Sequence, residues 1–334
     1  MSVVNLERAL ALLRAGEAVA IPTETVYGLA CDAANPAAIA RLYALKGRPA
    51  DHPVIVHVAS ARALSFWTRE LPPAAHALAA AFWPGPLTLI LKRAAHVPDA
   101  VTGGQDTVGV RCPDHPVALA LLAACEALGI AGLAAPSANR FGHVSPTHPA
   151  HVEAEFGHDV PVLDGGPCRV GIESTIVDLT GAEARILRPG MLDANALSSV
   201  ISLAAAPNAA EVPRVSGSLA AHYAPDTALE IVPALSLRGR IAEWAATGLK
   251  LGVLAHSLHE RDAVAATGTV AWFVLPQTPE GYARGLYAAL RAVDDARIAR
   301  LLVESVPATD AWAGVRDRLT RAAHGSGRTT AVPQ

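Results

Sequence analysis

The sequence has few aromatic residues, few cysteines and no long apolar run. Aromatic residues make up 4% of its 334 residues, although 51% are hydrophobic, mainly Ala, Leu and Val. No apolar stretch reaches the roughly 18 residues that a membrane-spanning helix needs. The first twenty residues place Glu7 and Arg8 inside an apolar pattern and lack the charge-then-apolar order of a signal peptide. We therefore expect a soluble, cytoplasmic protein with no membrane segment.

The sequence also lacks the spacings of a disulfide or metal framework. No CxxC pair occurs, and the four cysteines are scattered, at Cys31, Cys112, Cys125 and Cys168. This favours a reducing compartment. Among 13 histidines, the densest group matches no zinc spacing and is interrupted by prolines; its members are His143, His148, His151 and His158. The sequence predicts no metal site built from side chains.

The familiar nucleotide and hydrolase motifs are missing as well. There is no GxxxxGK[ST], no GxGxxG after a strand, no HExxH and no GxSxG. Any nucleotide chemistry must therefore use another scaffold. With a formal net charge of −3, we expect no attraction of the whole molecule to nucleic acid. A local basic patch is still compatible with this charge, so the sequence leaves direct tRNA binding open.

The chain length favours two domains. In residues 1–203 the pattern is mixed α/β, with a helix from Leu6 to Gly16 and a second one capped by Asn35-Pro36. A third helix is predicted at 116–128, and Thr147 is expected to cap a fourth. The expected strands are 18–21, 54–58, 87–91, 107–110, 130–134, 160–163, 174–179 and 185–187.

From about residue 204 the pattern changes. Residues 204–226 have little periodicity and many turn residues, which indicates a linker. Residues 227–324 then predict a small α/β domain, with strands at 228–232, 251–255, 270–275 and 301–306 and helices at 237–246, from Glu280, and at the end. The tail, 325–334, is expected to be flexible.

Three polar segments follow predicted strands or helices. In the first, Lys46 and Arg48 flank Gly47, a pattern that suits a polyphosphate but also an ordinary solvated helix exit. The second, APSANRFGHVSPT, offers Ser137, Asn139 and Ser145, which turn chemistry also explains. The third, DGGPCRVGIESTIVDL, is followed by Arg188, which at a strand end is most often solvated.

The order of these segments resembles that of the threonylcarbamoyl-AMP synthase family. The resemblance is carried by PTETVYGL, KGRP with HPVIVHV, WPGPLTLIL, TVGVR, APSAN, GIESTIVDL, ILRPG and HYAP. It implies a YrdC-like twisted, open, mixed sheet with a large concave cavity, plus a smaller, Rossmann-like α/β domain. It also implies a reaction: ATP, L-threonine and bicarbonate give threonylcarbamoyl-AMP and pyrophosphate. Mg²⁺ would accompany ATP, and a tRNA threonylcarbamoyltransferase complex would take the product.

The resemblance assigns roles to particular residues. ATP would contact Lys46, Arg48, His52, Thr107, Ser137, Asn139, Ser145, Arg188 and, from the linker, Tyr223. Threonine would contact Thr25, His57, Arg111, Ala135 (through its backbone) and Ser174. Lys46 and Arg48 would be the catalytic cations. His52 departs from the family pattern, in which Asn is expected, and the linker from Gly217 to Pro225 is predicted to act as a lid.

Two other readings differ from this one. A carbamoyltransferase of the hydrogenase-maturation type shares the pattern of the first domain, but those proteins carry paired CxxC zinc fingers that this chain lacks. An RNA-binding module using a basic cavity is the non-enzymatic alternative. The mild acidity and the lack of an aromatic-basic stripe count against it.

Overall fold

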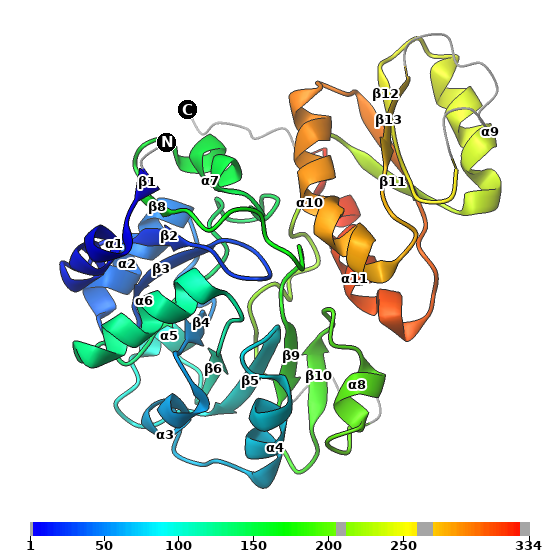
Figure 1. Ribbon diagram of the computed structural model, residues 1–334. Helices are drawn as coiled ribbons and strands as arrows, with labels where there is room; N and C mark the ends of the chain where they lie inside the picture. Colours follow the sequence, from blue (N-terminus) through cyan, green and yellow to red (C-terminus); the bar gives the residue numbers. More distant parts are fainter. Residues whose placement is uncertain (1–2, 205–211, 259–269, 328–334) are drawn as a thin grey trace. The chain divides into compact units, whose positions relative to one another are not determined.

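The computed structural model describes residues 3–204, 212–258 and 270–327, and these form two compact units (Figure 1). The first unit comprises Met1–Phe141 and Ser145–Ser218. The second comprises Leu219–Gln334 together with Gly142–Val144, a short stretch from the middle of the first-domain sequence. The mixed α/β class and the second α/β unit confirm the predicted fold class.

A ten-stranded mixed sheet organises the first unit. Its strands, in spatial order, are β1 (Val3–Val4), β8 (Val162–Leu163), β2 (Val19–Ile21), β3 (Gly28–Asp32), β7 (Leu133–Ala134), β4 (Ile55–His57), β6 (Thr107–Arg111), β5 (Leu87–Lys92), β9 (Thr175–Asp178) and β10 (Arg185–Arg188). The sheet combines parallel and antiparallel pairs: β4 runs parallel to β6, whereas β5 is antiparallel to β6 and parallel to β9.

Helices pack around this sheet (Figure 1). They are α1 (Leu6–Arg14), α2 (Pro36–Lys46), α3 (Leu64–Trp67), α4 (Pro73–Phe82), α5 (Asp99–Thr102), α6 (Pro116–Ala127), α7 (Pro149–Phe156) and α8 (Ala194–Ser198), with a 3₁₀ turn at Ala61–Ala63. α1 packs against α6, and α2 packs against β3. Because the central strands are covered by apolar neighbours, Leu29, Val56, Leu89 and Val110 are fully buried.

The helix signals in the sequence are mostly confirmed. The Asn35 side chain accepts hydrogen bonds from the Ala37 and Ala38 amides, which lack partners within the helix, and Pro36 opens α2. One prediction is wrong: the residue that caps α7 is His148, whose ring accepts from the Ala150 amide, rather than Thr147. The strands β1 and β3 and the helices α3, α4, α5 and α8 are not among the elements that the sequence predicts.

The second unit has a four-stranded parallel sheet. Its order is β11 (Leu229–Val232), β14 (Arg300–Glu304), β12 (Leu251–Ala255) and β13 (Val270–Val274). Figure 1 shows α9 (Ala234–Ala245) on one face and α10 (Pro279–Asp295) and α11 (Ala313–Gly325) on the other, after a 3₁₀ turn at Asp310–Trp312. The predicted strand at 251–255 is confirmed at both ends.

Two boundaries differ from the sequence-based prediction. α9 begins three residues before Leu237, because Pro233 ends the preceding extended backbone and its neighbours continue directly into the helix. The helix α11 reaches Gly325, the first residue of the expected tail. The rest of that tail from residue 328, like linker residues 205–211, lies outside the described residues.

Candidate active site

A turn directly after β2 places two threonines and a glutamate in the interior. Thr23 Oγ1 lies 2.8 Å from Thr25 Oγ1 and donates to the Val26 carbonyl at 2.6 Å. This hydroxyl also accepts from the amides of Thr25 and Val26, so the turn is closed by its own side chain. Thr23, Glu24 and Thr25 are all at most 2% exposed. Such a turn presents rigid polar groups at a strand end, where α/β sheets usually bind ligands.

Arg111, the last residue of β6, reaches into this turn. Its Nη1 donates to Thr25 Oγ1 at 2.9 Å, its Nε donates to the Gly85 carbonyl at 3.3 Å, and its Nη2 lies 2.7 Å from Glu24 Oε1. The guanidinium is therefore fixed in a buried position from three sides. A fixed and buried guanidinium is suited to a carboxylate ligand, because two parallel N–H groups can meet its two oxygens.

His57 ends β4 and lies opposite Arg111 in the parallel register. Burial and the nearby Arg111 charge lower the pKa of His57 to about 3, so the ring is neutral near pH 7. Its Nδ1 lies 3.2 Å from the Ile55 carbonyl, which assigns the proton to Nδ1. Nε2 is then a hydrogen-bond acceptor, and His57 is well suited to a hydroxyl ligand.

The pair Lys46 and Arg48 is buried, with 2% and 7% of each residue exposed, so the interpretation as a solvated helix exit is wrong. Between them, Gly47 adopts a left-handed conformation (φ 63°) that turns the chain at the end of α2. The Lys46 ammonium donates to the Ser137 and Asn139 carbonyls. Burial, and secondarily Arg48, lowers the Lys46 pKa well below its usual range.

Arg48 is held by backbone and by aromatic rings. Its Nη2 donates to the Pro53 carbonyl at 2.7 Å, and its guanidinium carbon lies 5.8 Å from the Phe141 ring centre. His52, whose side chain is 24% exposed, packs edge-on against the same Phe141 ring at 5.4 Å. Burial and the Arg48 charge lower the pKa of His52, which disfavours an imidazolium beside a cation.

Backbone hydrogen bonds connect the loop after β7 to the segment PTETVYGL, residues 22–29. Leu29 donates to the Pro136 carbonyl and Ala138 donates to the Tyr27 carbonyl, at 2.7 and 2.8 Å. Ala135 is bonded to β4 instead, since its amide donates to the Ile55 carbonyl at 3.1 Å. Lys46 therefore meets the two carbonyls of a loop whose conformation is already fixed.

Asn139 and Ser145 lie at opposite ends of this loop and are both buried. The Asn139 Nδ2 donates to the Arg140 carbonyl at 2.7 Å. The Ser145 hydroxyl donates to Glu173 Oε1 at 2.6 Å, and Glu173 is 7% exposed. A short hydrogen bond to a buried carboxylate fixes the position of this hydroxyl.

Ser174 and Arg188 form a third cluster, and the expectation of a solvated Arg188 is wrong, since 2% of the residue is exposed. Arg188 ends β10, and its Nε and Nη2 donate to the Ser174 carbonyl at 3.1 and 2.9 Å. The Ser174 hydroxyl lies 2.8 Å from Thr88 Oγ1 and accepts from Arg188 Nη2 at 3.1 Å. The antiparallel pairing of β9 with β10 brings the two residues together.

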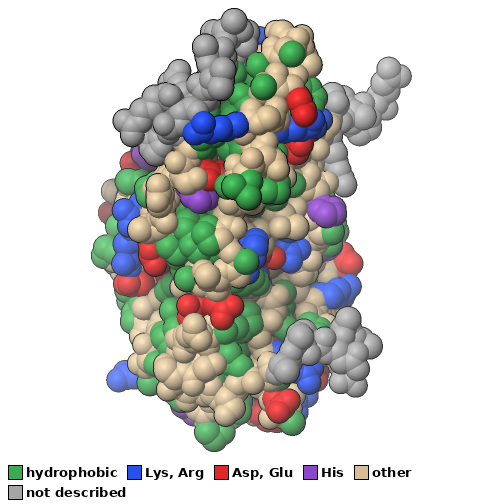
Figure 2. Space-filling view, turned by 90° about the vertical axis from the view of Figure 1, so that its right-hand side faces the viewer, with side chains coloured by type: hydrophobic (Ala, Val, Ile, Leu, Met, Phe, Trp, Pro, Cys, Tyr) green, Lys and Arg blue, Asp and Glu red, His purple; other side chains and the backbone are tan. Residues whose placement is uncertain are grey.

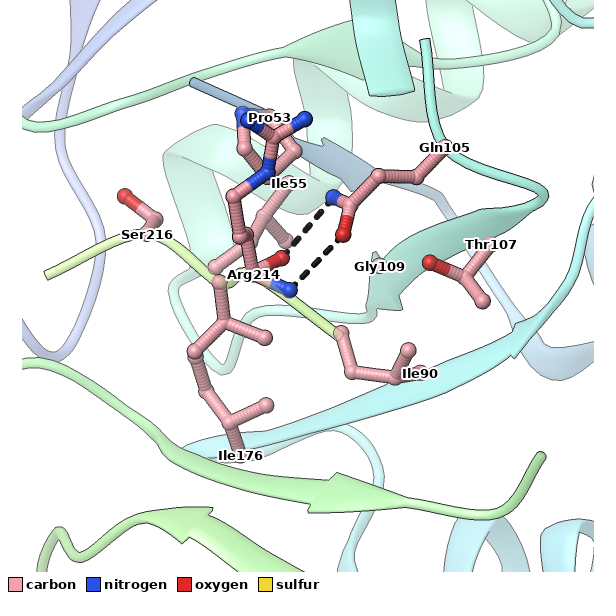
Figure 3. A pocket seen from close by; sticks show the side chains of 10 residues that line it. Pro53, Ile55, Ile90, Gln105, Thr107, Gly109, Ile176, Arg214 and Ser216 are labelled. Carbon is pink, nitrogen blue, oxygen red and sulfur yellow. Dashed lines mark hydrogen bonds between the residues drawn. The ribbon is translucent and has the colours of Figure 1, made fainter. Parts of the chain in front are cut away.

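Linker residues 214–216 line a small pocket on the sheet of the first unit (Figure 3). The Arg214 amide donates to Gln105 Oε1 at 2.7 Å, and Gln105 Nε2 donates to the Arg214 carbonyl at 3.0 Å. Val215 packs on Ile90 and Ile176. Thr107 lines the same pocket, and Ser216 accepts from Arg188 Nη1 at 2.8 Å.

Tyr223, the remaining predicted ligand, belongs to the second unit. It is 1% exposed and has a φ of 59°, an uncommon value for a residue with a side chain. Its ring stacks on that of Tyr287 at 5.8 Å, and the Arg318 guanidinium carbon lies 5.1 Å from its centre. In this unit Ala224 also donates to the Gly142 carbonyl at 3.0 Å.

The structure thus brings Thr25, His57 and Arg111 together in one cluster. It joins Lys46 to the loop of Ser137 and Asn139. Sequence reasoning missed two buried carboxylates, Glu24 and Glu173. A signal for both was present in the sequence: each glutamate stands among apolar and hydroxyl-bearing residues, in PTETVYGL and in GIESTIVDL.

These features define an α/β protein whose polar site lies at the ends of sheet strands. A family model described as "Telomere recombination" (Sua5_yciO_yrdC) matches residues 11–190, and one described as "Threonylcarbamoyl-AMP synthase, C-terminal domain" matches residues 192–324.

Relatives and solved structures agree with these matches. The threonylcarbamoyl-AMP synthase of Pyrococcus abyssi is 39% identical over 94% of this chain and 92% of its own length. That of Bacillus subtilis is 38% identical over 96% and 93%. The crystal structure of P. abyssi Sua5 complexed with L-threonine superposes with a TM-score of 0.86 at 37% identity, covering 96% of this chain and 94% of that one. The chain belongs to the threonylcarbamoyl-AMP synthase family, in its two-domain form.

Proposed function

We propose that this chain synthesises threonylcarbamoyl-AMP from ATP, L-threonine and bicarbonate and releases pyrophosphate. The observation that carries the proposal is the buried Arg111 guanidinium, held beside Thr25 and next to the neutral ring of His57. A guanidinium and a neutral acceptor match the carboxylate and the hydroxyl of threonine. The names of the relatives, and the threonine complex of the P. abyssi protein, support this substrate.

In the proposed threonine site, Arg111 binds the carboxylate and His57 Nε2 accepts from the hydroxyl. Thr25, Ser174 and the backbone of Ala135 complete the pocket. A site that hydrogen-bonds the hydroxyl rejects valine strongly, because its own polar groups would lose their partner. Discrimination against serine, which lacks a methyl group, is limited to about 1–3 kcal/mol.

The proposed ATP site takes its cations from Lys46, Arg48 and Arg188, which are buried at three different points of the first unit. The remaining ligands are His52, Thr107, Ser137, Asn139, Ser145 and Tyr223. Lys46 and Arg48 are the proposed catalytic cations. Binding phosphate at Lys46 would restore the charged form that burial disfavours, since an adjacent anion raises the pKa of an amine.

Mg²⁺ is proposed to accompany ATP and to neutralise charge on its phosphates. Among the described residues, no group of three or more His, Cys, Asp or Glu side chains is placed to hold a metal ion. This fits an ion bound largely through phosphate oxygens and water, as Mg²⁺ usually is. Glu173 is not itself a proposed ATP ligand, but it accepts from the proposed ligand Ser145, and it would be the protein contact of the ion.

The proposed reaction has two steps. The threonine amine, once deprotonated, attacks the carbon of bicarbonate, and water leaves to give a carbamate. A carbamate oxygen then attacks the α-phosphorus of ATP and pyrophosphate leaves. Neither step needs a covalent enzyme intermediate, so the chain acts by positioning the reactants and stabilising charge with Lys46, Arg48 and Arg111.

The linker is proposed to close the site as a lid. Its residues 214–216 already lie against the sheet that carries Thr107. Tyr223 and His222 supply an aromatic ring and an imidazole to the HYAP segment. Closure would exclude water and protect the carbamate from loss of carbon dioxide.

The product is proposed to pass to a tRNA threonylcarbamoyltransferase complex in the cytoplasm. All four cysteines are free and buried, as is usual for a protein of a reducing compartment. No helix of the described chain has the length and hydropathy needed to cross a bilayer. On the face seen in Figure 2, Lys and Arg side chains lie among Asp and Glu side chains rather than forming a continuous basic field. This favours the enzyme over an RNA-binding module.

Product analysis tests the proposal. Purified protein incubated with ATP, bicarbonate and L-threonine should release pyrophosphate, and mass spectrometry should detect threonylcarbamoyl-AMP. Omission of threonine or bicarbonate should abolish both signals. Salt-sensitive RNA retention without threonine-dependent pyrophosphate release would instead identify a binding module.

A further inference from the structure

Glu24 is a buried carboxylate with an unusually poor set of hydrogen-bond donors. The residue is 1% exposed, and neither of its carboxylate oxygens has a hydrogen-bond partner among the described residues. Its Oε1 lies 2.7 Å from Arg111 Nη2, within ion-pair distance, but without hydrogen-bond geometry. An ionised carboxylate has about four acceptor positions, and burying it without donors costs several kcal/mol. Glu24 Oε2 is thus directed at no donor of the described chain.

The backbone of the turn explains why Glu24 cannot move away. The Thr23 hydroxyl closes the turn around Glu24, because it contacts the Thr25 hydroxyl and accepts from the Thr25 amide. The Glu24 and Thr25 carbonyls accept from the amides of Val170 and Gly171 at 2.8 and 3.1 Å. The chain is therefore fixed on both sides, and the side chain has to stay in the interior beside Arg111.

Three titratable side chains that interact electrostatically with Glu24 are neutral near pH 7. Burial raises the pKa of the Cys112 thiol to about 11 and that of Cys168 to about 12, and burial lowers the pKa of His115. His57 is neutral as well. Arg111 and Glu24 therefore present one positive and one negative charge side by side, in contact with Thr25.

We infer that Glu24 binds the α-ammonium group of L-threonine while Arg111 binds its carboxylate. The inference rests on the proposed threonine site and adds to it a residue that selects an α-amino acid over a hydroxy acid. A zwitterion carries its two charges on neighbouring carbons, which matches two opposite charges held 2.7 Å apart. Threonine would supply the donor that Glu24 Oε2 lacks and would leave the net charge of the site unchanged.

A pair of ligands separates this role from a role in merely orienting Arg111. L-threonine has both charged groups, whereas (R)-3-hydroxybutanoate has the same carboxylate, hydroxyl and methyl but no amine. The proteins to be compared by calorimetry are the wild type, Glu24→Gln and, as a control, Asp178→Asn. Asp178 is also a buried carboxylate of the first unit, 3% exposed, and it is hydrogen-bonded by Thr180 rather than by site residues.

Glu24→Gln should weaken L-threonine binding about 10- to 150-fold, the effect of losing a charged hydrogen bond. Its affinity for (R)-3-hydroxybutanoate should be unchanged or higher, because Arg111 no longer has a competing anion. Asp178→Asn should bind both ligands like the wild type. If Glu24→Gln is unfolded in a thermal melt, Glu24→Asp replaces it; this variant keeps the charge at a greater distance and should show a smaller, still threonine-specific loss.

Three results would overturn the inference. An equal loss for both ligands would mean that Glu24 acts only through Arg111. Unchanged threonine affinity in folded Glu24→Gln would remove Glu24 from the site while leaving the proposed function intact. Failure of the wild type to bind threonine and to release pyrophosphate would overturn the proposed function and this inference together.

Discussion

His57 of β4 lies opposite Arg111 of β6 in a parallel register, and the two residues are 3% and 4% exposed. A neutral imidazole and a permanent cation can share this interior because burial and the Arg111 charge together keep the proton off the ring. The relationship links the stability of the protein to pH.

Acidification should destabilise the protein through His57. In the unfolded chain this ring titrates near its ordinary pKa of about 6.5, and in the folded chain near about 3. Between these values the unfolded state binds one more proton, so the free energy of unfolding falls as pH falls, by up to about 1.4 kcal/mol per pH unit. Above about pH 6.5 this penalty is absent.

Urea denaturation between pH 4.5 and 7.5 measures this slope. His57→Gln should show a shallower decline on the acid side, and the exposed His158→Gln should match the wild type. An identical slope in wild type and His57→Gln would show that His57 is not the group responsible.

Arg111→Ala should weaken threonine binding more than ATP binding. Loss of a charged hydrogen bond costs about 1.5–3 kcal/mol, which corresponds to about 10- to 150-fold in affinity. Calorimetry with each ligand separates the two effects. Arg69→Ala, which removes an exposed arginine paired with Asp106, is the matched control and should change neither affinity. Equal threonine affinity in Arg111→Ala and wild type would contradict the proposed site.

Lys46→Ala and Arg48→Ala should each lower ATP-dependent pyrophosphate release by about 10- to 150-fold at subsaturating ATP. Lys46 also holds the Ser137 and Asn139 carbonyls, so circular dichroism and a thermal melt must first show that the variant is folded. The partly exposed Lys92→Ala serves as the control. Near-wild-type rates in both folded variants would remove the phosphate assignment.

Ser145→Ala should destabilise the first unit by about 1–3 kcal/mol, because it takes one donor from the buried Glu173 carboxylate. Adding Glu173→Gln should recover part of this loss, since a neutral amide is less costly to bury than a carboxylate with fewer donors. Chemical denaturation of the two single variants and the double variant gives the coupling. Strict additivity would show that the 2.6 Å contact contributes little to stability.

Gln105→Ala should loosen the linker where it crosses the sheet, because it removes both hydrogen bonds to the Arg214 backbone. Hydrogen exchange across residues 212–218 should then become faster. In the wild type, exchange across 216–225 should slow when ATP and threonine are both present, as the lid proposal requires. Equal exchange with and without the ligands, together with full activity of a chain cut before Ser216, would reduce the segment to a passive connector.

Local signals in the sequence determined much of the secondary structure. The Asn35-Pro36 start of α2 and the five-residue strand Leu251–Ala255 follow from capping and from apolar runs, which depend on neighbours in the chain alone. The motif order likewise identified the family. β3 was not predicted because Gly28, Ala30 and Asp32 have weak strand preference; pairing with β2 and β7 stabilises this strand instead.

Only the tertiary structure decided which polar residues are buried and which of them meet. Lys46 and Arg188 looked like ordinary solvated cations in the sequence, because charge at an element end is usually exposed. Both are buried by segments about 90 and 14 residues away, whose carbonyls accept their protons. Glu24 became a candidate ligand only when strand order placed Arg111 within 2.7 Å of it. Sequence sets local preference, but burial and pairing depend on contacts between distant segments, and those exist only in the folded chain.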